Sequence, residues 1–428
     1  MANNHYDVII LGESLASRIA AVLLAKAGRR VLFAGLPATA SCPAWIPASL
    51  HLQRLLELLG NSSCLVSAPP FQVLSGQVRL TLHGISALHD ELRREFPADS
   101  IRVQQLLREL DSTGTRLETA LLESEGLPLT GWASRWQFMR KRLLKGLTWG
   151  RLARPLANKL KGGNSAQTVQ ALSTLFSGLA LRPIEHLSVA EGALLWRGFG
   201  NNQGISARDL NVLLTHHFEL FHGEQVSLAD LKSVQATDRR LREAVFMNGR
   251  RCTAEVFLLG SRDANRLLPG EFRADETVDH PLLAIEARIA DGTISPLLAQ
   301  VLILAGSPPL RLTLLPDSAG SRCRVHCQAT GPASDTSGAA QLEGRLSELF
   351  PFATLCFEPR AAIQSGPAAV SEDRSRRQKT FPGATSSLIA GEHLLYCCGE
   401  QVLPGLGATG EIMVGVSVVN HLQRKIRH

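Results

Sequence analysis

A turn near the N-terminus combines residue types and a spacing that could hold a diphosphate. The stretch DVIILGESLASRIAAVLLAKAGRRVLFAG, residues 7–35, has the pattern of a buried strand, a turn, a helix and a second strand. A dinucleotide site requires G-x-G-x-x-G at such a turn and an acid at the end of the second strand. Here Gly12 is kept, but Ser14, Ser17 and Gly35 stand at the other three positions. The pattern therefore indicates a degenerate dinucleotide motif.

The same turn has features that favour an anion and one that opposes it. A helix that begins near Leu15 presents free N–H groups, and the Ser14 hydroxyl can donate to a phosphate. Glu13 brings a negative charge close to the same point. A cofactor site and a structural β-α-β unit without a ligand both remain open from this stretch. In either case the two strands are predicted to be parallel.

The composition indicates a folded intracellular protein, with one very large domain or two to three ordinary ones. The chain has 428 residues, of which 45% are hydrophobic and 19% charged, so it can bury a sizeable core. Eight cysteines in this length do not suggest a disulfide framework, which favours a reducing compartment. Neither a secretory signal nor an apolar run long enough to span a bilayer is found, so a cytoplasmic location is expected. The net charge of +7 suits an anionic partner.

A basic segment from 132 to 161 could contact a membrane. It belongs to a span, 126–184, that contains no Asp or Glu and in which Arg and Lys alternate with Trp and Leu. Pro155 should divide it into two short helices. Such a segment suits peripheral adsorption to the inner face of an anionic membrane. The alternative is a solvated helix pair whose leucines pack on the core. Nucleic acid is not expected, because no nucleic-acid module surrounds these residues.

The middle of the chain alternates helical and strand patterns. A helix is predicted from about Ser206, its N-cap, to Phe221. Asn248-Gly249 between two apolar runs predicts a β-hairpin. Strands are expected to dominate residues 282–329. The apolar stretch from Ala171 to Leu181 is a candidate wall of a ligand tunnel, or else a plain core helix.

No metal site is predicted from the cysteines and histidines. In a strand, Cys323 and Cys327 would share one face and His326 would point to the other, so the three could not converge on one ion. His217 and His222 are out of phase on their helix and are expected to face solvent.

The C-terminal region carries the most specific pattern. The stretch CCGEQVLPGLGATGEIMVG, residues 397–415, is predicted to be a strand end, a glycine-rich loop from Gly399 to Glu411, and a helix from Ile412. With this motif, the chain resembles the flavin-dependent phytoene desaturase and amine oxidase superfamily over nearly its whole length.

The resemblance implies an α/β fold with two domains. One is a Rossmann-like FAD-binding domain built from three separated segments, 1–75, 200–275 and 375–428. The other is an α+β substrate domain formed by 76–199 and 276–374. A ligand cavity is expected between them.

The resemblance also implies a set of cofactor-binding positions, while no catalytic residue is assigned. The positions are Gly12, Ser14, Leu15, Ser17, Gly35, Leu231, Gly399, Glu400, Thr409, Gly410 and Glu411. Gly399 and Glu400 would lie by the ribitol and the pyrophosphate, and Leu231 by the adenine. Thr409 to Glu411 would place a helix start near the pyrimidine edge of the flavin.

Two functions follow from the resemblance. The favoured one is FAD-dependent oxidation or desaturation of an apolar, possibly isoprenoid substrate. The superfamily fold also includes the Rab GDP dissociation inhibitors, which bind prenylated partners without flavin. Since Ser14 and Gly35 depart from the motif, and the Gly-Gly-Arg segment that follows the second strand in the family is missing, the alternative is a flavin-free binding protein for a lipid or prenyl group.

Overall fold

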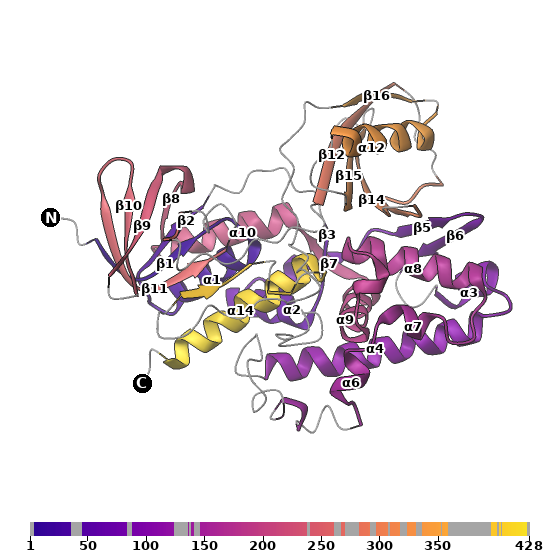
Figure 1. Ribbon diagram of the computed structural model, residues 1–428, viewed down its shortest axis with the longest axis horizontal. Coiled ribbons are helices and arrows are strands. Elements are labelled where there is room, and N and C mark those ends of the chain that lie inside the picture. The colour runs from indigo at the N-terminus through magenta and orange to yellow at the C-terminus, as the bar shows by residue number, and fades with distance from the viewer. Residues whose placement is uncertain are drawn as a thin grey trace.

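The computed structural model of the chain contains two large β-sheets, each with helices packed on it (Figure 1). The residues that the structure describes are 4–35, 45–83, 88–123, 136, 138–140, 146–237, 240–260, 267–269, 282–291, 297–306, 309–316, 323–330, 336–351, 353–357, 395–399, 402–403 and 405–425.

The first sheet has a parallel part and an antiparallel part. Its parallel strands are, in order, β8 (Glu224–Val226), β2 (Val31–Ala34), β1 (His5–Leu11), β11 (Arg251–Leu259) and β17 (Leu395–Cys397). The start of β11 also pairs with β10 (Arg240–Phe246), which pairs with β9 (Leu231–Thr237), both antiparallel. Val8 to Leu11 are shielded from solvent, as expected for a strand covered on both faces. The predicted parallel β-α-β unit and the hairpin at Gly249, whose φ is +81°, are confirmed.

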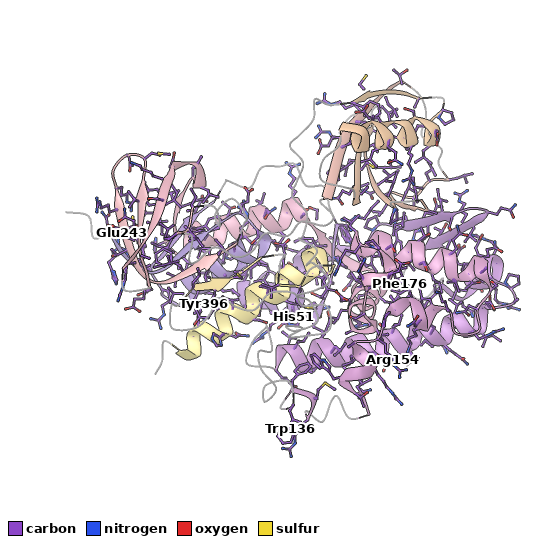
Figure 2. All side chains as sticks on the ribbon, in the orientation of Figure 1. His51, Trp136, Arg154, Phe176, Glu243 and Tyr396 are labelled. Carbon is purple, nitrogen blue, oxygen red and sulfur yellow. The ribbon has the colours of Figure 1, made fainter. Side chains whose placement is uncertain are left out.

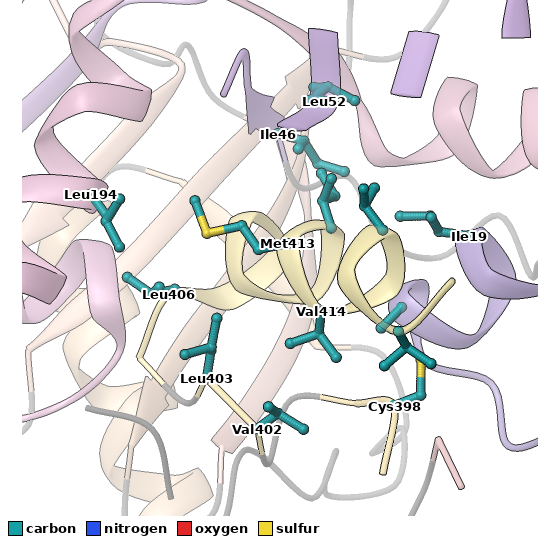
Figure 3. Packing of buried hydrophobic residues seen from close by; sticks show 14 of the residues in the cluster. Ile19, Ile46, Leu52, Leu194, Cys398, Val402, Leu403, Leu406, Met413 and Val414 are labelled. Atoms are coloured by element: carbon teal, nitrogen blue, oxygen red, sulfur yellow. The ribbon is translucent and has the colours of Figure 1, made fainter. Parts of the chain in front are cut away.

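Three helices cover this sheet, and two of them lie side by side. Figure 1 shows α14 (Gly407–Lys425) running along α1 (Leu15–Lys26), and α10 (Ala207–Leu220) also packs on α1. Both faces of α14 are covered, with Ile19 near one side and Leu403 and Leu406 near another (Figure 3). The predicted N-cap of α10 is confirmed, since the Ser206 side chain accepts from Asp209 N at 3.0 Å.

The second sheet is formed mainly by later strands. Its order is β16 (Thr354–Phe357), β12 (Leu282–Asp291), β15 (Cys323–Thr330), β14 (Leu310–Pro316), β13 (Val301–Leu304), β5 (Phe71–Ser75) and β6 (Val78–Leu82). β5 lies within the segment 1–75 that was assigned to the FAD-binding domain, but it pairs with β13 in this second sheet. The boundary at residue 75 was therefore placed too late.

One face of the second sheet packs on α12 (Thr336–Leu349), and the other partly on α8 (Ala166–Ala180). Cys327 and Leu346 share the cluster on the α12 side. His326 points to the opposite face, where its Nδ1 lies 3.3 Å from Glu286. The prediction that Cys327 and His326 point to opposite faces of this strand is confirmed.

A small sheet and further helices connect these layers. The sheet contains β3 (Trp45–Pro47), β7 (Gln203–Ser206) and β4 (Val66–Ser67). The helices are α2 (Leu50–Leu59), α3 (Leu88–Glu95), α4 (Ser100–Leu122), α6 (Trp149–Leu152), α7 (Leu156–Leu160) and α9 (Val189–Gly200), with short 3-10 turns at Ser62–Cys64, Ile184–His186 and Leu228–Asp230. None of the helices in the described ranges is long and apolar enough to cross a membrane.

The basic segment is split at Pro155 into α6 and α7, as predicted. Its leucines Leu152, Leu156 and Leu160 are at most 1% exposed, so they belong to the core. Trp136 projects at the edge of the molecule with Arg140 4.3 Å from its ring (Figure 2). Of the basic residues described in this segment, Arg140, Arg151, Arg154 and Lys161 are exposed, whereas these leucines are not.

Two further predictions were wrong in detail. α14 begins at Gly407 and not at Ile412, so Thr409 to Glu411 are helical and not part of a loop. His217 is buried and does not face solvent. Its ring hydrogen-bonds to Asn61 Oδ1 at 2.8 Å.

Candidate functional site

The carboxyl ends of the parallel strands meet at one edge of the first sheet, where open α/β sheets bind their ligands. Four residues in the turns after these strands lie close together: Gly12, Gly35, Gly260 and Gly399. Gly12 N donates to Ala34 O at 2.8 Å, and Gly260 N donates to Leu11 O at 2.7 Å. A Cβ at Gly260 would collide with Ser17 Oγ, so backbone and side chain are in close contact here.

The two serines that replace motif glycines are bonded to the chain itself. Ser14 is the N-cap of α1 and accepts from Ser17 N at 3.1 Å. Ser14 Oγ donates to the Cys398 carbonyl oxygen at 2.9 Å, and Ser17 Oγ donates to the same oxygen at 3.1 Å. These hydroxyls therefore join the first turn of α1 to the end of β17.

The N-terminus of α1 also receives a carboxylate from the chain itself. Glu411 Oε2 accepts from Ala16 N at 3.2 Å, across 395 residues of sequence, and Glu411 is 7% exposed. A helix N-terminus favours an anion by about 0.3–1 kcal/mol. In a dinucleotide site that anion is the pyrophosphate. In this chain the anion at the helix N-terminus is the carboxylate of Glu411, a residue that was predicted to lie near a flavin.

Charges around this turn are mixed. Burial lowers the pKa of Arg18, while the negative charges of Glu13 and Glu411 act to raise it. Arg18 also lies 5.6 Å from the centre of the Phe33 ring. Two carboxylates and one guanidinium are therefore already gathered at the start of α1.

The position of the missing acid is filled by aromatic packing. A Cβ at Gly35 would lie 2.6 Å from the Phe33 ring and 3.1 Å from Gly12 O. The Phe33 ring packs edge-on against Phe218, with ring centres 6.1 Å apart. An acidic side chain at residue 35 would require this packing to shift.

These residues do not fit the diphosphate of FAD. A diphosphate at α1 would have to displace Glu411 from Ala16 N–H and the serine hydroxyls from Cys398 O. It would also meet the charge of Glu13. The geometry therefore favours the hydrogen bonds within the chain at this turn over a bound diphosphate.

The other predicted cofactor positions are dispersed or lie outside the site. Leu231 begins β9, which is separated from β11 by β10, and is 2% exposed. Thr409 and Gly410 are buried in the first turn of α14. Glu400 lies outside the described residues. Of the predicted positions, the structure thus brings together Gly12, Ser14, Ser17, Gly35, Gly399 and Glu411.

Sequence reasoning missed the partners of these residues. The Cys398 carbonyl group, Gly260 and Phe33 complete the closed turn. The run Val256 to Leu259 followed by a glycine is a local signal for Gly260, but no sequence pattern identifies a backbone carbonyl as an acceptor.

A cleft lies between the small sheet and the second large sheet. Its space not filled by atoms is about 590 Å³ with the mouth included, of which the centres of water molecules can occupy about 30 Å³. The apolar wall includes Trp45, Pro47, Phe71, Leu82, Phe199 and Val301. A Cβ at Gly198, also in the lining, would lie 4.0 Å from Thr409 Oγ1, so the cleft adjoins the start of α14.

The stretch considered as a tunnel wall is a core helix. Leu172, Leu175 and Phe176 of α8 are fully buried, and Phe176 packs on Trp196 with ring centres 6.4 Å apart. Figure 2 shows Phe176 inside the layer of helices.

No protein-family model matches the chain, and no curated protein sequence matches it. Solved structures do match over nearly the whole length. An oxidoreductase from Methanosarcina mazei has a TM-score of 0.65 at 13% identity, covering 96% of this chain and 99% of its own. Cyclohexylamine oxidase from Brevibacterium oxydans has a TM-score of 0.60 at 11% identity, covering 99% and 100%.

The chain has the fold of the FAD-binding, Rossmann-type oxidoreductases with a second domain. A Rab GDI from Plasmodium falciparum shares it, with a TM-score of 0.55 at 11% identity and coverage of 97% and 98%. At these identities the likeness concerns the fold alone, so the function has to be argued from the site.

Proposed function

We propose that the chain is a flavin-free ligand-binding protein on the fold of a flavin-dependent oxidoreductase. The observation that carries this proposal is the bond from Ala16 N to Glu411 Oε2 at 3.2 Å. It puts the protein's own carboxylate at the helix N-terminus where a dinucleotide fold binds pyrophosphate.

The serine hydroxyls support the same conclusion. A glycine at residue 14 would let a phosphate approach the backbone, but the Ser14 side chain occupies that space and bonds Cys398 O. Ser17 makes a second bond to the same oxygen. Both changes strengthen contacts within the chain at the expense of a ligand.

The ligand of this protein would bind in the cleft beside α14. Ligand pockets are commonly apolar clefts at domain interfaces, with a few placed polar groups. The cleft has this location and this kind of wall. An apolar molecule, such as a lipid or prenyl group, is the class that it suits.

One observation favours the second candidate, an FAD-dependent oxidoreductase acting on an apolar substrate. The cleft adjoins the first turn of α14, near Thr409, where the resemblance places the edge of a flavin. A flavin in this place would supply the oxidation chemistry. Glu411 would have to leave α1 for the rest of the cofactor to bind.

The absorption spectrum of the purified protein and a titration with FAD separate the candidates. We expect a colourless protein that does not quench the fluorescence of added FAD at concentrations of about 100 μM. Co-purified flavin in stoichiometric amount, or tight binding of added FAD, would overturn the proposal.

A variant that lacks these internal contacts tests whether they are the reason that FAD does not bind. Ser14→Gly, Ser17→Gly and Glu411→Ala together should gain measurable FAD affinity, whereas Glu13→Gln alone should not. Gly35→Glu is not added to this variant, because the new side chain would clash with the Phe33 ring.

A further inference from the structure

A pocket lies where α1, α2 and α4 end beside the second half of α14 (Figure 1). It contains about 510 Å³ open to the centres of water molecules, compared with about 30 Å³ in the cleft beside the small sheet. Ligand pockets commonly have volumes of roughly 300–1,000 Å³. No described residue lines both spaces, so this pocket would be a separate site.

The wall of this pocket is mainly aliphatic. Leu23 of α1 and Val416 and Val419 of α14 line it and are at most 7% exposed. Leu58 of α2 and Leu122 of α4 also line it and are half-buried. Such a wall suits an aliphatic chain, because each CH2 group that leaves water there raises the affinity by up to about fourfold.

The two cations of the lining are already compensated within the chain. Lys26 Nζ donates to Leu58 O in the last turn of α2 and lies 5.8 Å from the centre of the Phe221 ring. Arg54 Nη1 lies 3.1 Å from Glu57 Oε2. The C-terminal ends of α1, α2 and α4 each add about half a negative charge. A ligand with a full charge of either sign would therefore find no uncompensated partner in the described lining.

Asn420 and Gln423 supply neutral polar groups. Together with Val416 and Val419 they form one face of α14, since these positions are three or four residues apart. Both amide side chains are half-buried, and neither has a hydrogen-bond partner in the described part of the chain. An amide offers two donors and an acceptor, which match a hydroxyl or a carbonyl group.

We infer that this pocket is a second ligand site, which binds an uncharged aliphatic molecule with a hydroxyl or carbonyl group. The aliphatic chain lies against Leu23, Val416 and Val419, and the polar group lies beside Asn420 and Gln423. A carboxylate or an ammonium group would lose hydration there without gaining an ion pair. The inference goes beyond the proposed function and involves none of its residues.

Three competitors with the same aliphatic chain test the ligand class on the full chain. Decanol, decanoate and decylammonium each displace diphenylhexatriene, a fluorescent hydrocarbon, and the loss of fluorescence gives their affinities. We expect decanol to bind at least about fivefold more tightly than either ion. It should also bind more tightly than octanol, by about fourfold for each CH2 group. Equal or tighter binding of either ion, or no binding of decanol, would overturn the inference.

A pair of alanine variants tests the location. Ala27 is the exposed C-cap residue of α1 and lines the pocket, so Ala27→Trp should fill it and weaken decanol binding by about tenfold or more. Ala153 is the exposed C-cap residue of α6, with φ −81° and ψ −6° against −75° and 8° for Ala27, and does not line the pocket. Ala153→Trp should therefore bind decanol as the wild-type protein does. If Ala27→Trp also does so, the inference fails.

A double variant tests the polar group. Asn420→Leu with Gln423→Leu removes both amides and keeps side chains of similar size. Decanol binding should weaken by about three- to tenfold, the value of one or two neutral hydrogen bonds. Binding of diphenylhexatriene should change less than about twofold, which also shows that the variant is folded. An unchanged affinity for decanol would contradict the inference. The FAD titration concerns the turn at the start of α1, so its result decides the proposed function and not this site.

Discussion

Ser14 and Ser17 stand where a dinucleotide motif has glycine, and both hydroxyls bond the Cys398 carbonyl oxygen. The sequence shows the loss of the glycines but not the new partner of the serines. The same limit applies to Glu411, whose type and position suited a flavin site until its contact with Ala16 was known. At the scale of one residue, the hydrogen-bond partner of a side chain decides what that side chain does.

Because of Glu118 on α4, the stability of the folded protein is predicted to depend on pH. It is fully buried, and its Oε2 accepts from Leu50 N at 3.4 Å. Burial raises the pKa of Glu118 to about 7, while Leu50 N–H and Arg197 act to lower it. Since the folded protein holds this proton more tightly than the unfolded chain, stability falls as pH rises from about 4.5 to 7. The loss is about 3 kcal/mol.

Glu118→Gln should remove that loss. The variant should match the wild-type free energy of unfolding at pH 4.5 and exceed it by about 3 kcal/mol at pH 8, measured by urea denaturation. Burial lowers the pKa of His51 to about 3, which changes stability in the opposite direction, so the two proteins are compared at each pH. Glu109→Gln, exposed on the same helix, should show no such trend. A constant difference across pH would contradict the prediction.

At the scale of elements, hydrophobic period and caps predicted most of what the structure contains. The β1-α1-β2 unit, the N-cap of α10 and the hairpin at Asn248-Gly249 all follow local rules. The start of α14 was missed because Gly407 and Gly410 read as loop residues. A Cβ at Gly410 would lie 2.9 Å from Leu403 O, so glycine at this position lets the preceding loop pack closely against the first turn of α14.

The contact between α1 and α14 depends on another glycine. A Cβ at Gly415 would lie 2.8 Å from Ala16 O and 3.0 Å from Ile19 Cβ. Gly415→Ala should therefore push the helices apart and lower the free energy of unfolding by about 1–3 kcal/mol, despite the better helix propensity of alanine. Thermal or urea unfolding measures this.

Gly344 on α12 supplies the control, because nothing lies within 4 Å of its Cβ position. Gly344→Ala should stabilise the protein by about 0.5–1 kcal/mol. A stabilising Gly415→Ala would mean that α14 does not lie as close to α1 as described.

For the whole molecule, the division into two sheets could be predicted, but the closed site could not. The bond between Ala16 and Glu411 joins residues 395 positions apart. Patterns of period two or 3.6 carry no information at that distance. The boundary at residue 75 failed for a similar reason, since β5 joins the second sheet through its pairing with β13, far along the chain.

Membrane contact through 132–161 stays a prediction, and the fold makes it more specific. Because Leu152, Leu156 and Leu160 are buried, adsorption would depend mainly on charge, with exposed Trp136 as the described apolar side chain that could enter the bilayer interface. The protein should sediment with anionic vesicles at low salt and be released by about 0.5 M salt. Changing exposed Arg154 and Lys161 to Gln should weaken binding by about 2 kcal/mol, or roughly thirtyfold, since each basic residue contributes about 1 kcal/mol.

The control removes the same charge elsewhere on the surface. Arg208 and Lys232 are exposed on α10 and β9, so Arg208→Gln with Lys232→Gln lowers the net charge equally. If this variant loses as much binding, the whole net charge and not the basic segment attracts the vesicle. If wild-type binding survives high salt or extends to neutral vesicles, apolar side chains must enter the bilayer. Trp136 is exposed and could do so directly, whereas the buried leucines of α6 and α7 would first have to leave the core.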